Sequence, residues 1–132
     1  MIRMQTIPIE LISRKDYRRL RAMTYGDGGL MQYYIDSAYS KDKTRLRYRR
    51  REVAYVLYVD GKIVGWRLLL QCRNCSICIW RNVIHIFVRE KYRKLGYGKK
   101  IINNIIDLHP KLKLYCHGNI KFFKQFNIKS LT

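Results

Sequence analysis

Residues 88–100 combine closely spaced glycines with positive charge, a pattern suited to binding anions. Gly96 and Gly98 stand where an apolar run ends and a helical pattern begins. Glycine lets the backbone approach a ligand closely, and the first amides of a helix have no partner within the helix and carry the positive end of its dipole. Four cations flank these amides: Arg93, Lys94, Lys99 and Lys100. The segment predicts a phosphate site, and its charge suits a pyrophosphate; a solvated glycine loop is the alternative.

A second set of side chains could transfer protons. His85 falls inside the apolar run that precedes the glycine turn, and Tyr115 and His117 fall close together further along the chain. Imidazole has an unperturbed pKa of about 6.5, which suits a general base at neutral pH, and a phenol can act as a general acid. These three side chains are therefore candidate catalytic residues. A packed, hydrogen-bonded structural role is the alternative for each of them.

Three cysteines crowd into a short segment at Cys72, Cys75 and Cys78, and Cys116 follows at a distance. Thiolates at this spacing can share a zinc ion or an iron–sulfur cluster. The three residues straddle a predicted hairpin turn, however, and the chain shows no export signal that would favour disulfides. We therefore expect reduced, buried thiols and no bound metal.

The hydrophobic pattern predicts the elements that would position these residues. Its most regular feature is a β-hairpin, in which runs at 53–59 and 62–70 flank Asp60-Gly61, a dipeptide typical of two-residue turns. A third antiparallel strand is expected at 77–88, after a polar turn at Arg73-Asn74. Helical spacing predicts helices at 14–23, 30–40 and 98–108, the last ended by Pro110. Shorter strands are expected at 7–12 and 111–116, and a final helical turn at 121–126.

This order predicts an α/β (α+β) fold with a mixed, mostly antiparallel central sheet flanked by helices. The 132 residues suffice for one modest core, so we expect a single domain over residues 1–132. A hydrophobic fraction of 48% excludes a disordered basic tail. Because no apolar run reaches the length of a membrane span or a signal peptide, we expect a soluble, cytoplasmic protein without membrane contact.

Positive charge is the strongest compositional feature, since 28 Lys and Arg face 9 Asp and Glu for a formal charge of +19. A field of this sign favours a polyanionic partner. Residues 41–51 hold seven of the cations, and the helix predicted at 14–23 adds others. We expect phosphate contacts with DNA or RNA at five arginines: Arg45, Arg47, Arg49, Arg50 and Arg51. An acidic protein surface is the alternative partner, and a solvated loop is the alternative structure.

The spacing Arg93-x-x-Gly96-x-Gly98, between an apolar strand and an isoleucine-rich helix, resembles the acyl-CoA-binding signature of the GNAT family of N-acetyltransferases. The predicted hairpin and the order of elements are similar to that family nearly throughout. The resemblance implies a GNAT fold, C-terminally shortened relative to longer members, with acetyl-CoA as cosubstrate. It implies cofactor contacts at Ile86, Phe87, Val88, Arg93, Lys94, Leu95, Gly96, Tyr97, Gly98, Lys99, Phe122 and Phe123.

Two positions depart from the family pattern. Phe123 stands where many members have the tyrosine that protonates the leaving thiolate, and Asn82 stands where some have a glutamate base. Neither side chain can transfer a proton in that role. An amine that is already neutral at working pH would need only positioning, with water relaying its proton.

The resemblance implies an acetyl-CoA-dependent N-acetyltransferase. From the charge we expect its acceptor amine on nucleic acid or on a nucleic-acid-associated target. One alternative is a GNAT-fold module that binds nucleic acid with little or no turnover. The other is a protein lysine acetyltransferase that acts on a host factor, because the composition of so short a chain suits a phage or another AT-rich genome. A dimer is compatible with either.

Overall fold

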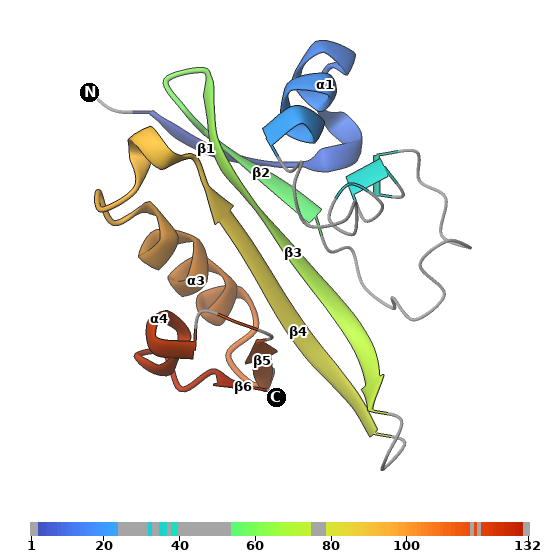
Figure 1. Ribbon diagram of the computed structural model, residues 1–132, viewed down its shortest axis with the longest axis vertical. Coiled ribbons are helices and arrows are strands. Elements are labelled where there is room, and N and C mark those ends of the chain that lie inside the picture. Colours follow the sequence, from blue (N-terminus) through green and yellow to red (C-terminus); the bar gives the residue numbers. More distant parts are fainter. Residues whose placement is uncertain are drawn as a thin grey trace.

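We analysed a computed structural model, which describes residues 3–23, 32, 35–36, 38–39, 54–74, 79–116, 118 and 120–130. Within these ranges the chain builds one six-stranded sheet whose strands follow one another in chain order (Figure 1). The strands are β1 (Met4–Pro8), β2 (Ala54–Val59), β3 (Lys62–Asn74), β4 (Ile79–Val88), β5 (Leu114–Cys116) and β6 (Lys129–Ser130). β1 to β4 pair antiparallel, whereas β4–β5 and β5–β6 pair parallel.

Helical segments connect and cover the strands. They are the 3₁₀ turn η1 (Ile9–Leu11), α1 (Arg14–Met23), the 3₁₀ turn η2 (Glu90–Tyr92), α3 (Tyr97–Leu108) and α4 (Ile120–Lys124). The described positions of the helix expected at 30–40 also have helical backbone. No helix in the described ranges is long and apolar enough to cross a membrane.

The β2–β3 hairpin forms as its turn sequence predicts. Asp60 and Gly61 both have positive φ, at 51° and 78°, which is the geometry of a two-residue turn that matches the twist of the strands. The Asp60 amide donates to the Arg3 carbonyl at 2.8 Å, and the Asp60 carboxylate accepts from the Arg3 amide at 2.9 Å. The turn therefore also anchors the start of β1.

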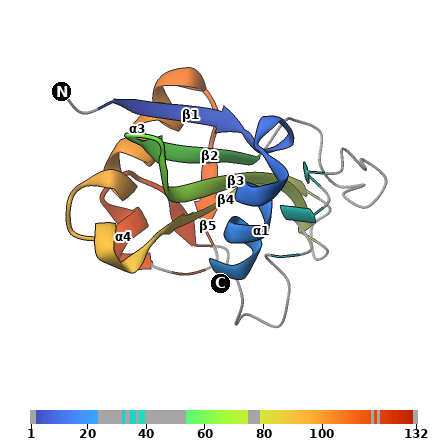
Figure 2. The same cartoon turned by 90° about the horizontal axis from the view of Figure 1, so that it is seen from above.

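Helices cover both faces of the sheet (Figures 1 and 2). On one face α3 buries Ile101, Ile102 and Ile105. On the other face α1 buries Leu20, and the Tyr58 hydroxyl of β2 donates to Asp16 of α1 at 2.8 Å. Strand side chains alternate between faces, but a bulge shifts the β2–β3 register between Leu57 and Tyr58. Beyond the bulge, faces are therefore assigned from Arg67 of β3, which donates to Asn104 of α3 and so marks the α3 face.

The structure corrects several expected boundaries. Arg73 and Asn74 do not form a turn: they continue β3 and pair with Trp80 and Ile79 of β4. The backbone ladder with β4 extends β3 past these residues, and a ladder with a partner strand cannot be recognised from the polarity of one strand alone. The strand expected at 7–12 instead occupies Met4–Pro8 and passes into a 3₁₀ turn. Pro8 suits the end of an edge strand, since it has no amide to donate.

The C-terminal strands also differ from the expectation. β5 covers only Leu114–Cys116 of the strand expected at 111–116, and β6 was not expected. A strand of two residues shows no alternation that a sequence pattern could reveal. The hairpin, the long strand that follows it and the helices at 14–23 and 97–108 are confirmed.

Gly65 provides a test of how closely β3 and β4 approach. It pairs with Val88, and a Cβ added to it would lie 2.1 Å from the Phe87 carbonyl oxygen. We predict that Gly65→Ala lowers the free energy of unfolding in urea by about 2 kcal/mol or more, because the backbone itself must shift. Gly118→Ala is the control, since a Cβ there meets nothing within 4 Å. Equal stability of the two variants would contradict the close approach.

Candidate functional site

The site begins where β4 and β5 separate. In the described residues these two strands pair at only two positions, Asn82 with Leu114 and Val83 with Tyr115. β4 continues to Val88, and β3 stays paired with it over that whole length. The C-terminal half of β4 therefore has a strand neighbour on one side, while α3 runs beside its other side (Figure 1).

Hydrogen bonding defines which backbone groups face this opening. The Arg89 amide donates to the Val64 carbonyl at 2.8 Å, so Val88 and Gly65 form a pair without mutual hydrogen bonds. Because the direction alternates along an antiparallel strand, the polar backbone groups of Ile86 and Val88 point away from β3. The Val88 carbonyl accepts from Arg93 Nε at 2.7 Å, which leaves the Val88 amide and both polar groups of Ile86 directed into the opening.

The start of α3 closes the other side. Gly96 is the N-terminal cap with φ of 86°, a left-handed conformation that favours glycine. The bond from the Lys100 amide to the Gly96 carbonyl, at 3.1 Å, is the first of the helix. The preceding amides, including those of Gly98 and Lys99, have no acceptor within the helix. A Cβ on Gly98 would lie 3.2 Å from the Phe122 ring, so glycine also allows α4 to pack here.

Together these elements form an open cleft of about 620 Å³, which we name the β4–α3 cleft. Its lining comprises Ile86, Phe87, Val88, Tyr92, Arg93, Lys94, Gly96, Tyr97, Gly98, Lys99 and Phe122. Ten of these residues were expected at a cofactor site from the sequence. Tyr92 was not, although it lies inside the same segment; a 3₁₀ turn before the glycines brings it to the cleft.

Two expected residues lie elsewhere. Leu95 is 61% exposed and does not line the cleft. Phe123 is only 4% exposed, in the core, and its neighbour Phe122 takes the position at the cleft wall. Adjacent helical residues point in directions about 100° apart, so only one of the pair can face the cleft.

The cleft is strongly cationic. Arg93, Lys94 and Lys99 line it, and no Asp or Glu among the described residues does. The Arg93 guanidinium carbon lies 5.6 Å from the centre of the Phe87 ring, so its contacts within the described residues are a ring face and the Val88 carbonyl. With unbonded helix amides and flanking cations, the arrangement suits an anion of more than one charge.

Two of the three candidate catalytic residues share one face of the sheet. Val83 and Tyr115 are direct neighbours across β4 and β5, and His85 follows Val83 by two residues, so register places His85 and Tyr115 on the α1 face. Tyr115 is 7% exposed, and the Lys113 ammonium lies 5.8 Å from its ring centre. His85 lies on β4 just past the last position paired with β5 and is half-buried. His117 lies outside the described residues.

Asn82 lies on the opposite face, where it contributes to the junction of the strands. Its side-chain amide donates to the Lys113 carbonyl at 3.5 Å, at the point where β4 and β5 pair. The residue therefore holds the two strands together below the opening.

Comparison with known proteins now assigns the chain to a family. The model of the acetyltransferase (GNAT) family matches residues 14–127, which is most of the chain. The chain belongs to the GNAT acetyltransferase family. A search among curated proteins found no match.

Solved structures confirm that this acetyltransferase has the GNAT fold. A GNAT family acetyltransferase from Brucella melitensis in complex with acetyl-CoA has a TM-score of 0.65 at 11% identity, covering 96% of this chain and 81% of that one. The Bacillus subtilis N-acetyltransferase YlbP in complex with coenzyme A has 0.58 at 15%, covering 96% and 82%. Arabidopsis thaliana Naa50 with a bisubstrate analogue has 0.55 at 20%, covering 95% and 81%.

A second concave surface, which we name the basic groove, lies on the α1 side of the acetyltransferase. It has a volume of about 580 Å³ and four cationic lining residues, namely Arg19, Lys62, Arg89 and Lys91. Asp16 is the only acid among the described residues of its lining, and it already accepts from Tyr58 and lies 3.8 Å from Arg19. Sequence reasoning predicted a basic face but not this groove, because its cations come from three separate segments.

Tyrosines fix α1 beside this groove. The Tyr17 hydroxyl donates to Asp36, and the Tyr17 ring stacks on Tyr39 with centres 4.0 Å apart. Burial, together with Asp36, raises the pKa of Tyr17 to about 12, so this donor stays protonated at neutral pH. Burial and the contact with Asp16 likewise raise the pKa of Tyr58. Both hydroxyls therefore remain donors over the physiological range.

The other sequence expectations for this region lie mostly outside the described residues. These are the five arginines expected to bind nucleic acid, Arg45, Arg47, Arg49, Arg50 and Arg51, as well as Cys75 and Cys78. Cys116 is a buried free thiol. In the described part of the chain no group of three or more His, Cys, Asp or Glu residues could hold a metal ion.

Substitutions can test whether Phe123 lies in the core or at the cleft. We predict that Phe123→Tyr lowers the free energy of unfolding by about 1–3 kcal/mol, because it buries a hydroxyl in an apolar core, and that it does not accelerate acetyl transfer. Phe122→Tyr is the matched control, since Phe122 is half-buried at the cleft. Denaturant titration and a transfer assay of both variants provide the measurements. Faster transfer by Phe123→Tyr at wild-type stability would contradict this placement.

Proposed function

We propose that this acetyltransferase binds acetyl-CoA in the β4–α3 cleft and transfers the acetyl group to an amine. The proposal rests on one observation: unpaired backbone groups of β4 and of the first turn of α3 face the same cationic cleft. Helix amides at the start of α3 suit the pyrophosphate, and the backbone of Ile86 and Val88 suits the amide groups of the pantetheine arm. Arg93, Lys94 and Lys99 supply the compensating charge.

The proposed reaction balances as a direct transfer. The amine nitrogen attacks the thioester carbonyl, a C–N bond forms, the C–S bond breaks, and the sulfur leaves as a thiolate. One proton leaves the amine and one is taken up by the thiolate, so the products are an amide and the free thiol. The acetyl-CoA and coenzyme A complexes of the Brucella and Bacillus proteins support the choice of cosubstrate.

We propose that protons move on the α1 face. His85 would accept the proton of the amine, since imidazole is partly neutral at pH 7. Tyr115 is the proposed acid, although its burial would require the thiolate to form close beside β5. Phe123 and Asn82 cannot take these parts, because a phenyl ring has no proton to give and an amide is not a base.

We further propose that the acceptor amine belongs to nucleic acid, which is a polyanion, or to a target associated with nucleic acid. The basic groove lies on the same face as His85 and Tyr115. On α1, Arg14, Lys15 and Arg18 are exposed and pair with no acid among the described residues. Phosphate contacts are the physical expectation for such a surface.

A charge reversal in the cleft tests the cosubstrate site. We predict that Lys99→Glu weakens acetyl-CoA binding by about tenfold or more in calorimetry, because it places a negative charge beside the proposed pyrophosphate position. Lys111→Glu is the matched control, as Lys111 is exposed and lies outside the cleft. Equal affinity of the two variants would place acetyl-CoA elsewhere.

A second test concerns the acceptor. We predict that replacing Arg19, Lys62 and Lys91 by Ser weakens binding to an RNA or DNA oligonucleotide by about tenfold or more at low salt. The slope of log affinity against log salt concentration should also fall in magnitude by about 2 to 3, because each lost phosphate contact removes a counterion-release contribution. The control replaces three exposed lysines distant from the groove: Lys111, Lys121 and Lys124.

Isotopically labelled acetyl-CoA identifies the product in the same samples. Label on nucleic acid, or on a protein bound to it, supports the proposal. Label on a protein lysine with an unchanged salt slope would instead indicate a protein lysine acetyltransferase, and binding without transfer would indicate a non-catalytic module.

A further inference from the structure

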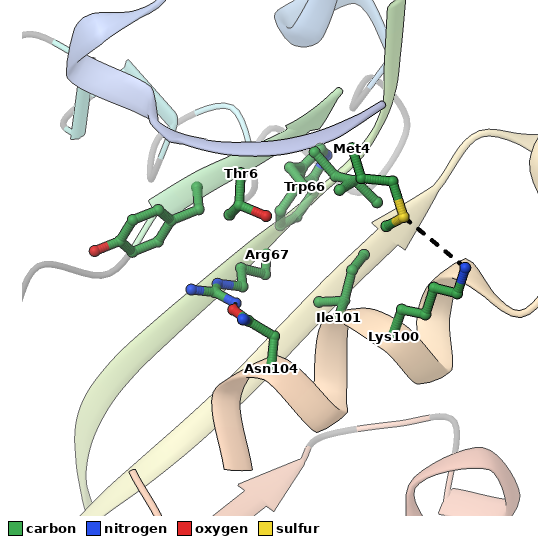
Figure 3. Close-up of a pocket in the computed structure, with 9 residues that line it drawn as sticks. Met4, Thr6, Trp66, Arg67, Lys100, Ile101 and Asn104 are labelled. Atoms are coloured by element: carbon green, nitrogen blue, oxygen red, sulfur yellow. Dashed lines mark hydrogen bonds between the residues drawn. The ribbon is translucent and has the colours of Figure 1, made fainter. Parts of the chain in front are cut away.

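A separate cavity lies between α3 and strands β1 to β3, on the face opposite the basic groove (Figure 3). Its volume is about 240 Å³. The lining residues are Met4, Thr6, Tyr55, Leu57, Trp66, Arg67, Lys100, Ile101 and Asn104. None of them lines the β4–α3 cleft, because Lys100, Ile101 and Asn104 lie on a different side of α3 from Gly98 and Lys99.

Arg67 is the unusual residue of this cavity. It is 7% exposed and is the only charged residue among the buried residues described. Its guanidinium donates to Asn104 of α3, and its carbon lies 4.5 Å from the centre of the Tyr55 ring. Figure 3 shows the side chain reaching from β3 across the cavity toward Asn104. These partners orient the guanidinium, but both are neutral.

Within the described part of the chain, no acid compensates the charge of Arg67. No described Asp or Glu lines the cavity, and none forms an ion pair with Arg67. Burial lowers the pKa of Arg67, which is the direction expected for a cation removed from water without an anion beside it. A buried cation of this kind is costly unless it is paired.

Lys100 adds a second cation at the mouth of the same cavity. Its ammonium lies 3.8 Å from the Met4 sulfur, which is a weak acceptor, and 5.6 Å from the centre of the Tyr97 ring. Neither contact neutralises the charge. The cavity thus presents a guanidinium held by Asn104 and an exposed ammonium, with no anion among its described lining residues.

We propose that this cavity binds a small organic carboxylate with a compact apolar body. A guanidinium and a carboxylate pair through two parallel hydrogen bonds, and Arg67 uses one nitrogen on Asn104, so other N–H groups remain for the ligand. Met4, Leu57 and Ile101 give apolar walls for the rest of the molecule. The volume is below the usual range for drug-sized ligands, which limits the body to a single ring or a short branched chain.

A carboxylate fits these walls better than a phosphate does. Among the residues that the structure describes, Arg67 is the only buried cation, and the apolar side chains cannot solvate a second negative charge. A purely structural role for Arg67, as a link between β3 and Asn104, does not account for the cavity or for the second cation at its mouth. The proposal is independent of the cosubstrate and acceptor assigned above.

Titrations with benzoate, benzamide and inorganic phosphate test the proposal on the full chain. Benzamide has the shape of benzoate without its charge. We predict saturable binding of benzoate, with shifts of the Ile101 and Asn104 amide signals in NMR spectra, and at least about tenfold weaker binding of benzamide and phosphate. Benzoate should also raise the melting temperature, and the rise should continue with the logarithm of its concentration above the dissociation constant.

Variants locate the ligand. Lys100→Gln should weaken benzoate binding by about threefold to tenfold, whereas Lys111→Gln, an exposed lysine outside the cavity, should not change it. Arg67→Met should abolish benzoate binding. If this variant does not fold, the affinity of Lys100→Gln and the residues whose NMR signals shift still show whether benzoate occupies the cavity. Absence of saturable binding, equal affinity for benzamide, or shifts confined to the β4–α3 cleft would overturn the proposal. Tighter binding of phosphate than of benzoate would overturn the assignment of ligand class.

Discussion

The site of this acetyltransferase depends on one asymmetry in hydrogen bonding: β4 is paired with β3 along its whole length but with β5 at only two described positions. Because β3 holds β4 rigidly, the polar groups on its free edge stay in a fixed row. An unpaired strand edge is normally a liability that must be covered. Here α3 runs beside the edge and brings its own unbonded amides to the same opening, and the proposed cosubstrate site rests on these two features.

α3 connects three parts of the molecule. Its buried isoleucines pack on the sheet, its first turn faces the β4–α3 cleft, and Lys100 and Asn104 face the cavity that contains Arg67. The helix therefore separates two cationic concavities of different chemistry. The cleft is open and lined by backbone amides, whereas the cavity is smaller and built around one buried guanidinium. Some of the 28 cations of the chain therefore line concave surfaces.

The two faces of the sheet divide the chemistry. The α1 face carries His85, Tyr115 and the basic groove, and the α3 face carries the apolar packing and the Arg67 cavity. The cleft lies at the edge between them. In the proposed arrangement, an acceptor on the α1 side would approach the cosubstrate from the direction opposite to α3, without competing for the same cations.

The sequence by itself determined the parts of this protein that local interactions control. The Asp60-Gly61 turn, the helices expected at 14–23 and 98–108 and the glycine turn before the second of these helices were all predicted, because turn geometry, side-chain spacing and helix capping depend on neighbouring residues. Ten residues of the cleft were anticipated for the same reason, since nine of them lie in one continuous segment; Phe122 comes from α4.

Only the tertiary structure decided what depends on long-range placement. Sequence reasoning gave Phe123 a place at the cofactor, but the direction in which α4 packs turns it into the core and presents Phe122 instead. The continuation of β3 through Arg73 and Asn74 depends on a partner strand, not on their polarity. The Arg67 cavity could not be anticipated at all: an arginine in a strand pattern is normally assigned to the exposed face, and its burial results from α3 packing over a position that the sequence shows only as polar.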